Sequence, residues 1–106
     1  MDKPTKFQLA VWKSCSKIPK GKVSTYAEIA RAISRPKAMR AVGNALNKNP
    51  YSPRVPCHRV VMGNGKIGGF ADGANRKIKM LRAEGVQIKN KKIIGFENAF
   101  IILRRP

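Results

Sequence analysis

Two threonines fix where this chain can begin a helix. Thr5 and Thr25 are each followed, three residues later, by Gln or Glu, which is the spacing of a capping box. In that motif the two side chains satisfy backbone N–H groups that are free at a helix N-terminus. Apolar residues then recur every three or four positions behind each motif. We therefore predict one helix over residues 5–17 and a second over residues 25–33.

A third helix is predicted to follow after a short break. Residues 34–36 read Ser-Arg-Pro, and Pro36 is well placed to open a helix over residues 36–48. One face of that helix is apolar and the opposite face carries basic and amide side chains. Two short helices joined by a tight turn, the second with a basic face, are typical of a helix-turn-helix.

The second half of the chain predicts a smaller β element and one more helix. Three prolines within residues 49–56 exclude a regular element there. Residues 60–68 predict a hairpin with an Asn-Gly turn, which would be the wing of a winged helix. Residues 75–84 predict a fourth helix, with Ile78 and Leu81 inward. Its outward residues would be Arg76, Lys77, Lys79 and Arg82. Residues 86–94 could pair across a lysine-rich turn. The expected fold class is mainly α, a winged helix-turn-helix-like domain with a small β-hairpin wing.

The charge balance points to a polyanion as partner. The chain has 23 Lys and Arg against 5 Asp and Glu, a net charge of +18, far more than a small domain of 106 residues needs for solubility. Nucleic acid is the partner we favour, because neutralising phosphates gives affinity for any sequence. A basic surface without a partner is the alternative. No apolar run is long enough to cross a membrane, and the N-terminus lacks the pattern of a signal peptide.

The cysteine count favours a reducing, cytoplasmic setting. Cys15 and Cys57 are isolated from one another and do not form a disulfide framework. Together with His58, the only histidine, they are too few to hold a structural zinc ion, so we expect no metal site.

The segment Pro-Cys-His-Arg-Val at residues 56–60 is the sharpest chemical feature. A cysteine beside a histidine and arginines lies in a positive field, which favours the nucleophilic thiolate form. The alternative is a small buried cysteine that only fills space.

Several separate stretches of the sequence, taken in order together with this motif, resemble those of one protein family. They comprise residues 18–30, 35–43, 49–50, 55–61, 68–70, 77–81 and 84–85. In these blocks the chain resembles the C-terminal domain of the methylated-DNA–protein-cysteine methyltransferases, the O6-alkylguanine-DNA alkyltransferases. The resemblance runs from about Thr5 to Val86.

The resemblance implies a DNA-repair enzyme that acts once and needs no cofactor. Cys57 would take an alkyl group from the O6 atom of guanine in DNA. His58, through a water molecule, and Glu84 would remove the thiol proton. Asn49 would hold the turn around the cysteine, and Tyr26 would give a proton to the departing guanine and help rotate the nucleotide.

The same resemblance implies how double-stranded DNA is bound. The third helix would lie in the minor groove, and Arg40 would fill the space left by the flipped base, with Lys37 and Asn44 on the same face. Ala41 and Gly43 are small enough to allow close approach of the backbone. We also expect Ser24 and Thr25 to contact DNA. The base pocket would be formed by Val60, Gly68, Phe70 and Ala71.

Two departures from the family pattern leave a rival interpretation open. We expect residues 1–106 to be a single domain, without the N-terminal domain that family members usually carry. Ala71 stands where many members have a serine, and Asp72 places an acid beside the expected pocket. Alkyltransferase-like proteins, which bind alkylated guanine and recruit other repair factors without transferring the group, also lack that N-terminal domain. Their nucleophile is typically replaced by Trp, whereas this chain has Cys57. A winged-helix DNA binder with an inert cysteine is the third possibility, and we expect a monomer in each case.

Overall fold

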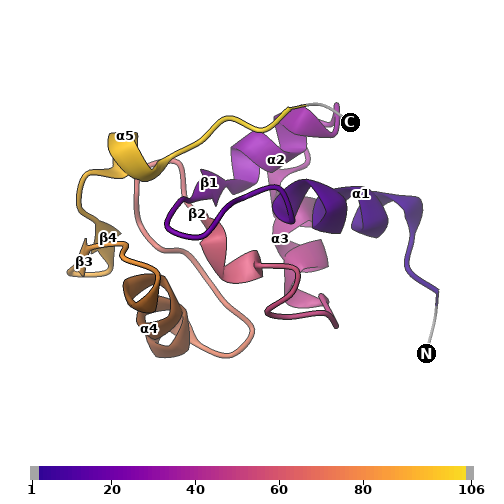
Figure 1. Ribbon diagram of the computed structural model, residues 1–106. Helices are drawn as coiled ribbons and strands as arrows, with labels where there is room; N and C mark the ends of the chain where they lie inside the picture. Colours follow the sequence, from indigo (N-terminus) through magenta and orange to yellow (C-terminus); the bar gives the residue numbers. More distant parts are fainter. Residues whose placement is uncertain (1–2, 105–106) are drawn as a thin grey trace.

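Three helices form the first half of the molecule. The computed structural model describes residues 3–104, and α1 (Lys6–Cys15), α2 (Tyr26–Ala32) and α3 (Met39–Asn47) lie together on one side of it (Figure 1). The capping box that opens α1 is complete, because the Thr5 side chain accepts from the Gln8 N–H and the Gln8 side chain accepts from the Thr5 N–H. The first two helices therefore begin where the threonine motifs predict.

The helix-turn-helix is present, with a longer turn than predicted. α3 begins at Met39, not at Pro36, because residues 35–38 form a turn closed by a hydrogen bond from the Ala38 N–H to the Arg35 carbonyl. Val42, Ala45 and Leu46 are buried against the other helices. The opposite side of α3 is open to solvent.

A narrow strand layer joins the two halves of the chain. β1 (Ser24–Thr25) pairs in parallel with β2 (Val60–Val61), and Val23 on its other side forms a parallel bridge with Phe100. This corrects the predicted hairpin over residues 60–68. The turn is there, since the Met62 N–H donates to the Lys66 carbonyl, but the strand that precedes it pairs with β1 from 36 residues earlier in the chain.

The antiparallel hairpin lies nearer the C-terminus. β3 (Ile88–Lys89) pairs with β4 (Lys92–Ile93) across a two-residue turn, as the pattern of residues 86–94 suggested. Lys66 bridges β4 on its outer side. We call this hairpin the wing. The fold class, mainly helical with small β elements, is as predicted, and only the position of the wing differs.

α4 (Ala74–Ala83) packs beneath the wing, and it contains the largest departure from the predicted burial pattern. Leu81 is fully buried and Ile78 partly so, as expected. Lys77, predicted to face solvent, is fully buried. It precedes Leu81 by four residues, so the two side chains share one helix face.

Two hydrophobic clusters make up the core. The helix cluster, between α1, α2 and α3, contains Val11, Trp12, Ile29, Val42, Cys57 and Val60. The wing cluster, between α4 and the wing, contains Val23, Val61, Ile67, Leu81, Ile88 and Ile93. The neighbours Val60 and Val61 belong to different clusters because successive side chains of a strand point to opposite faces. The strand layer is thus the boundary between the two.

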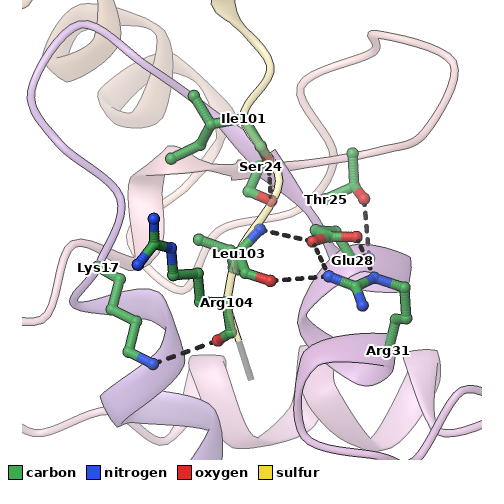
Figure 2. Close-up of polar contacts among 8 residues, drawn as sticks. All are labelled: Lys17, Ser24, Thr25, Glu28, Arg31, Ile101, Leu103 and Arg104. Carbon is green, nitrogen blue, oxygen red and sulfur yellow. Dashed lines mark hydrogen bonds and ion pairs between the residues drawn. The ribbon is translucent and has the colours of Figure 1, made fainter. Parts of the chain in front are cut away.

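The C-terminal segment closes the molecule by running back over β1 toward α2 (Figure 1). The Ile101 N–H donates to the Val23 carbonyl, and the Ser24 hydroxyl donates to the Ile101 carbonyl. Glu28 completes the attachment, because its carboxylate accepts from the Leu103 N–H at 2.6 Å (Figure 2). Leu103, beyond the predicted elements, is therefore part of the core, and Ile101 packs against it.

Glu28 was predicted to complete a second capping box, and it does something else. Its backbone N–H donates to the Thr25 side chain, which is the first half of the motif. Its carboxylate instead pairs with Arg31 at 2.8 and 2.7 Å and with the Leu103 N–H. The hydrogen bond from Arg31, with that from Leu103, holds the pKa of this carboxyl below its usual value in spite of burial. In the part of the chain that the structure describes, no helix is long and apolar enough to cross a membrane.

Candidate active site

Cys57 opens a single turn of 3-10 helix, η1 (Cys57–Arg59), directly after the proline-rich segment. Its N–H donates to the Val55 carbonyl at 2.9 Å. Asn49 holds the same carbonyl, because its side-chain amide donates to it at 2.9 Å while its oxygen accepts from the Tyr51 N–H at 2.8 Å. Asn49 therefore ties the end of α3 to the turn that presents the cysteine.

The two cysteines differ in accessibility. Cys15 is completely buried in the helix cluster, whereas Cys57 is buried with 8% of its surface exposed. Burial, and then the nearby Cys57, raise the pKa of the Cys15 thiol far above its usual value. A thiol held in its neutral form is a poor nucleophile. Cys57 is the candidate nucleophile, and Cys15 is a packing residue.

His58 and Glu84 lie together beside the cysteine. Nε2 of buried His58 is 3.1 Å from a carboxylate oxygen of Glu84, although the alignment falls short of a well-formed hydrogen bond. Burial lowers the pKa of His58 in spite of the nearby carboxylate, so the imidazole is neutral at neutral pH. Within the described residues, Nδ1 of His58 has no hydrogen-bonding partner.

Arg59 fixes the position of Glu84. Its guanidinium donates to both carboxylate oxygens, at 3.0 and 2.6 Å, and to the Ile18 carbonyl at 2.8 Å. Burial acts to raise the pKa of Glu84, but the hydrogen bonds from Arg59 and the close contact with His58 outweigh it, and the pKa lies below its usual value. Glu84 caps the C-terminus of α4, where a negative charge is unfavourable, and this two-point contact compensates for that position.

Lys77 is a site residue that the sequence analysis placed on the wrong face. Its ammonium donates to the carbonyls of Val60 and Gly69, at 2.6 and 3.0 Å, and to the Tyr26 hydroxyl at 3.4 Å. Burial lowers its pKa to about 8, partly opposed by the two cysteines. The signal that could have found it is its spacing from Leu81, which places both on the inner face of α4.

Tyr26, at the first position of α2, reaches the same group of atoms. Its hydroxyl donates to the Gly69 carbonyl at 3.3 Å, and burial followed by the neighbouring Cys57 raises its pKa, so it stays protonated at neutral pH. Gly68 has a φ of 73°, and a Cβ atom there would lie 3.0 Å from the Tyr26 oxygen. Only glycine allows the loop to approach this closely.

The expected base-pocket residues surround this point with different exposures. Val60 is fully buried, Gly68 and Phe70 are half-buried, and Ala71 is exposed. Phe70 packs against the helix cluster. The Val60 carbonyl already accepts from Lys77.

The expected DNA-contacting residues of α3 share one exposed face. Arg40, Ala41 and Asn44 are exposed on the helix, and Lys37 is exposed in the turn before it. Gly43 is half-buried beside the Tyr26 ring, 3.9 Å from where a Cβ would lie. Arg40 and Asn44 are four residues apart and share this exposed face, and Gly43 places the edge of the helix beside Tyr26.

Ser24 and Thr25 do not belong to this surface. Ser24 is fully buried and its hydroxyl is used by the Ile101 carbonyl, and Thr25 is 5% exposed and caps α2. Both side chains lie inside the molecule, where a nucleic acid cannot reach them. The expectation that they contact DNA is therefore wrong on grounds of burial. Among residues 3–104, no three His, Cys, Asp or Glu side chains gather as a metal site would require.

Comparison with known proteins agrees with this arrangement. Residues 6–86 match the family described as 6-O-methylguanine DNA methyltransferase, DNA binding domain. The chain belongs to this family. It is 51% identical over 81 residues to a methylated-DNA--protein-cysteine methyltransferase of Methanosarcina acetivorans, covering 76% of this chain and 52% of that protein. The protein of the same name from Shigella flexneri is 49% identical over 81 residues, covering 76% of this chain and 47% of that protein. The chain thus spans about half the length of the curated relatives it matches.

Two solved structures of related proteins differ in how much of each chain is shared. The Mycobacterium tuberculosis OGT in complex with DNA is 46% identical, with a TM-score of 0.75, over 77% of this chain and 51% of that one. S. pombe Atl1, in complex with damaged DNA containing O6-carboxymethylguanine, is 31% identical, with a TM-score of 0.83, over 94% of this chain and 98% of that one. The fold beyond residue 86 is thus shared with a protein of similar extent.

Proposed function

We propose that this chain transfers an alkyl group from O6-alkylguanine in double-stranded DNA to its own Cys57. The observation that carries the proposal is the position of Cys57, in a turn held by Asn49, next to the His58–Glu84 pair and within the electrostatic influence of Lys77. The relatives named methylated-DNA--protein-cysteine methyltransferase support the same chemistry.

The proposed reaction uses these groups in a fixed order. The Cys57 thiol gives its proton, through a water molecule, to Nδ1 of His58, and Glu84 stabilises the imidazolium that forms. The thiolate attacks the alkyl carbon, so that a C–S bond forms as the C–O6 bond breaks. The electron pair of the broken bond leaves with the guanine, which takes a proton from the Tyr26 hydroxyl. The product is an S-alkyl cysteine, and the protein is consumed.

Binding to DNA is proposed to expose the target atom. The O6 atom of a guanine inside a duplex is out of reach, so the nucleotide must rotate out of the stack at a cost of a few kcal/mol. Arg40 lies exposed on the face of α3 that ends at Tyr26, and its planar guanidinium can occupy the vacated space. Lys37 and Asn44 would contact the phosphates on the same face, with α3 in the minor groove.

Intact-mass measurement after mixing the protein with a duplex containing one O6-methylguanine tests this proposal. We expect a gain equal to one CH2 group in the unchanged protein and in Cys15→Ala, and no gain in Cys57→Ala. The Cys15→Ala variant is the matched control, because it removes the other thiol. Unchanged mass in all three proteins, with the duplex bound, would overturn the proposal.

A second candidate, recognition of damage without transfer, is favoured by one observation. Atl1, whose complex contains damaged DNA, shares the fold over 94% of this chain with a TM-score of 0.83. This candidate predicts tight, selective binding of the O6-methylguanine duplex that is the same for the unchanged protein and for Cys57→Ala, with no gain in mass. Equal affinity for modified and unmodified duplexes, with no gain in mass, would contradict both candidates and favour a plain DNA-binding domain.

A further inference from the structure

Lysines gather on one face of the wing. Lys89 lies directly opposite Lys92 across the hairpin, and Lys92 is bridged on its other side by Lys66. Paired residues of neighbouring strands point to the same side of a sheet, so these three side chains form one row. The other face of the hairpin, with Ile88 and Ile93, is buried in the wing cluster. The row therefore faces solvent.

This row is electrostatically unfavourable in the isolated protein. Like charges directly opposite one another in neighbouring strands are destabilising. Among the described residues, the ion pairs are formed by Arg31, Arg59, His58 and Arg76, and none includes a lysine. The repulsion within the row is thus not offset by a carboxylate of residues 3–104. An anionic partner would offset it.

The tip of the wing carries a fourth lysine in a strained conformation. Asn90 and Lys91 have φ angles of 53° and 59°, which are those of a two-residue hairpin turn. The second position of such a turn is usually glycine, because a side chain in the left-handed region is strained. Lys91 therefore places a fourth positive charge at the tip of the wing.

A groove connects this lysine cluster to the candidate active site. It has a volume of about 410 Å³, and it is lined by Met62, Lys66, Gly68, Ala74, Asn90 and Lys91, together with Ile67. Gly68 is the residue whose close approach to the Tyr26 hydroxyl leaves no room for a side chain. The surface therefore runs from α3, past Tyr26 and Gly68, to Lys66 and Lys91.

We propose that the lysine wing, defined as Lys66, Lys89, Lys91 and Lys92, binds phosphates of the DNA strand on the side of the lesion away from α3. This inference rests on the proposed function, and it concerns residues that lie mostly beyond the family match at residues 6–86. DNA suits the site because each strand carries one phosphate about every 3.4 Å of helix axis, so several phosphates can face a row of lysines at once. The molecule, 37 Å in its longest dimension, is long enough to cover about one helical turn of DNA.

The salt dependence of DNA binding tests the lysine wing. The variant Lys66→Gln/Lys92→Gln removes two charges of the row, and Lys13→Gln/Lys20→Gln removes two exposed charges on α1 and in the turn after it. For an unmodified duplex, we expect the slope of log K against log salt to become shallower by roughly 1.8 in the wing variant, since each phosphate contact contributes about 0.9. The matched control should change the slope much less. An unchanged slope in the wing variant, or equal changes in the two variants, would overturn the inference.

A second variant separates a loss of contact from a loss of folding. Lys91→Gly removes the charge and also relieves the strained turn. We expect it to weaken DNA binding at low salt severalfold while the melting temperature stays the same or rises. A lower melting temperature, or unchanged affinity, would contradict the assignment.

The outcome is independent of the chemistry at Cys57. Because the duplex in this test is unmodified, the slope can be measured even if no alkyl group is transferred. If Cys57 becomes alkylated and the wing variant keeps the parental slope, the proposal that the lysine wing binds DNA is wrong and the proposed function stands. If Cys57 is never alkylated and the slope still becomes shallower in the wing variant, the proposed DNA contact of the lysine wing stands and the proposal of alkyl transfer is wrong.

Discussion

The exposed face of α3 and the enclosed side chains of α4 differ in how they use charge. Arg40 on α3, and Lys37 in the turn before it, extend into solvent. Against the wing cluster, Lys77 is enclosed by two carbonyls and a hydroxyl, and Glu84 by two donor side chains. Exposed groups suit the binding of a large anionic partner, and enclosed groups suit the control of protonation. The face of α3 and the enclosed side chains of α4 are thus two units with different tasks, and they meet at Tyr26, which lies beside Gly43 and Lys77.

The largest expected effect separates chemistry from binding. Glu84→Gln keeps the shape of the side chain and removes the charge that stabilises a protonated His58. We expect the rate of alkyl transfer to fall by about 10²- to 10⁴-fold, the range typical of proton-transfer catalysis, with little change in affinity for the modified duplex. Single-turnover kinetics and a binding titration measure the two quantities. Glu97→Gln, at an exposed carboxyl on α5 (Phe96–Ala99), is the control. An equal loss of rate and affinity would remove the distinction between the two units.

The buried lysine gives the next largest effect, on stability. The pKa of Lys77 falls from 10.5 in the unfolded chain to about 8 in the fold, so between these values the unfolded chain binds more protons. The contribution of Lys77 to the free energy of unfolding is therefore lowest below pH 8. It increases as the pH rises toward 10.5, by roughly 3 kcal/mol at most. Lys77→Met removes this dependence.

The measurement is urea unfolding of the parent and Lys77→Met between pH 7 and 10. We expect the difference in unfolding free energy to shift in favour of the parent as the pH rises. Lys79→Met, at an exposed position of the same helix, controls for the general loss of positive charge. Parallel pH profiles for the parent and Lys77→Met would contradict a buried lysine.

The attachment of the C-terminal segment gives a moderate effect on the helix cluster. Glu28→Ala removes the acceptor that holds the Leu103 N–H and Arg31. We expect the free energy of unfolding to fall by about 2 kcal/mol, the usual contribution of hydrogen bonds to a charged group. Thermal denaturation measures it, with Glu97→Ala as the control. A loss confined to the control would show that the segment is not part of this core.

The smallest effect expected is on recognition. Arg40→Ala should reduce the preference for the modified over the unmodified duplex by roughly tenfold, since occupying a vacated stack is comparable to stacking of one base, about 1–3 kcal/mol. The rate of transfer at saturating DNA should change less. Lys13→Ala removes one exposed charge elsewhere and serves as the control for competition binding. If Arg40→Ala lowers only the rate of transfer at saturating DNA, α3 contributes to the chemistry. Binding and chemistry are then not separated as described above.

How far the sequence predicts the molecule depends on the range of each interaction. The Thr5 and Gln8 capping box is complete within one helical turn, and both helix starts were predicted. Glu28 was misassigned because its carboxylate binds a backbone group 75 residues away, which no local spacing reveals. The strand after η1 was assigned to a local hairpin for the same reason, since its partner β1 lies 36 residues earlier.

The candidate site follows the same rule. The turn around Cys57 and the exposed face of α3 depend on neighbouring residues, and the sequence predicts both. Lys77 was placed outside because a charged residue is normally exposed, and its burial depends on acceptors from two other segments. Arg59 was read as a source of positive field, whereas it holds Glu84 in place. Ser24 and Thr25 were taken as surface residues because a strand pairing on both sides of them was not foreseen.

Peptide-resolved mass spectrometry of the protein after exposure to an O6-methylguanine duplex tests the central claim most directly. The account predicts that the peptide with Cys57 gains one CH2 group and that the peptide with Cys15 gains none. The reason is that Cys57 is partly exposed and beside a proton acceptor, whereas Cys15 is completely buried. A gain on Cys15, or no gain on either peptide while the duplex is bound, would contradict it.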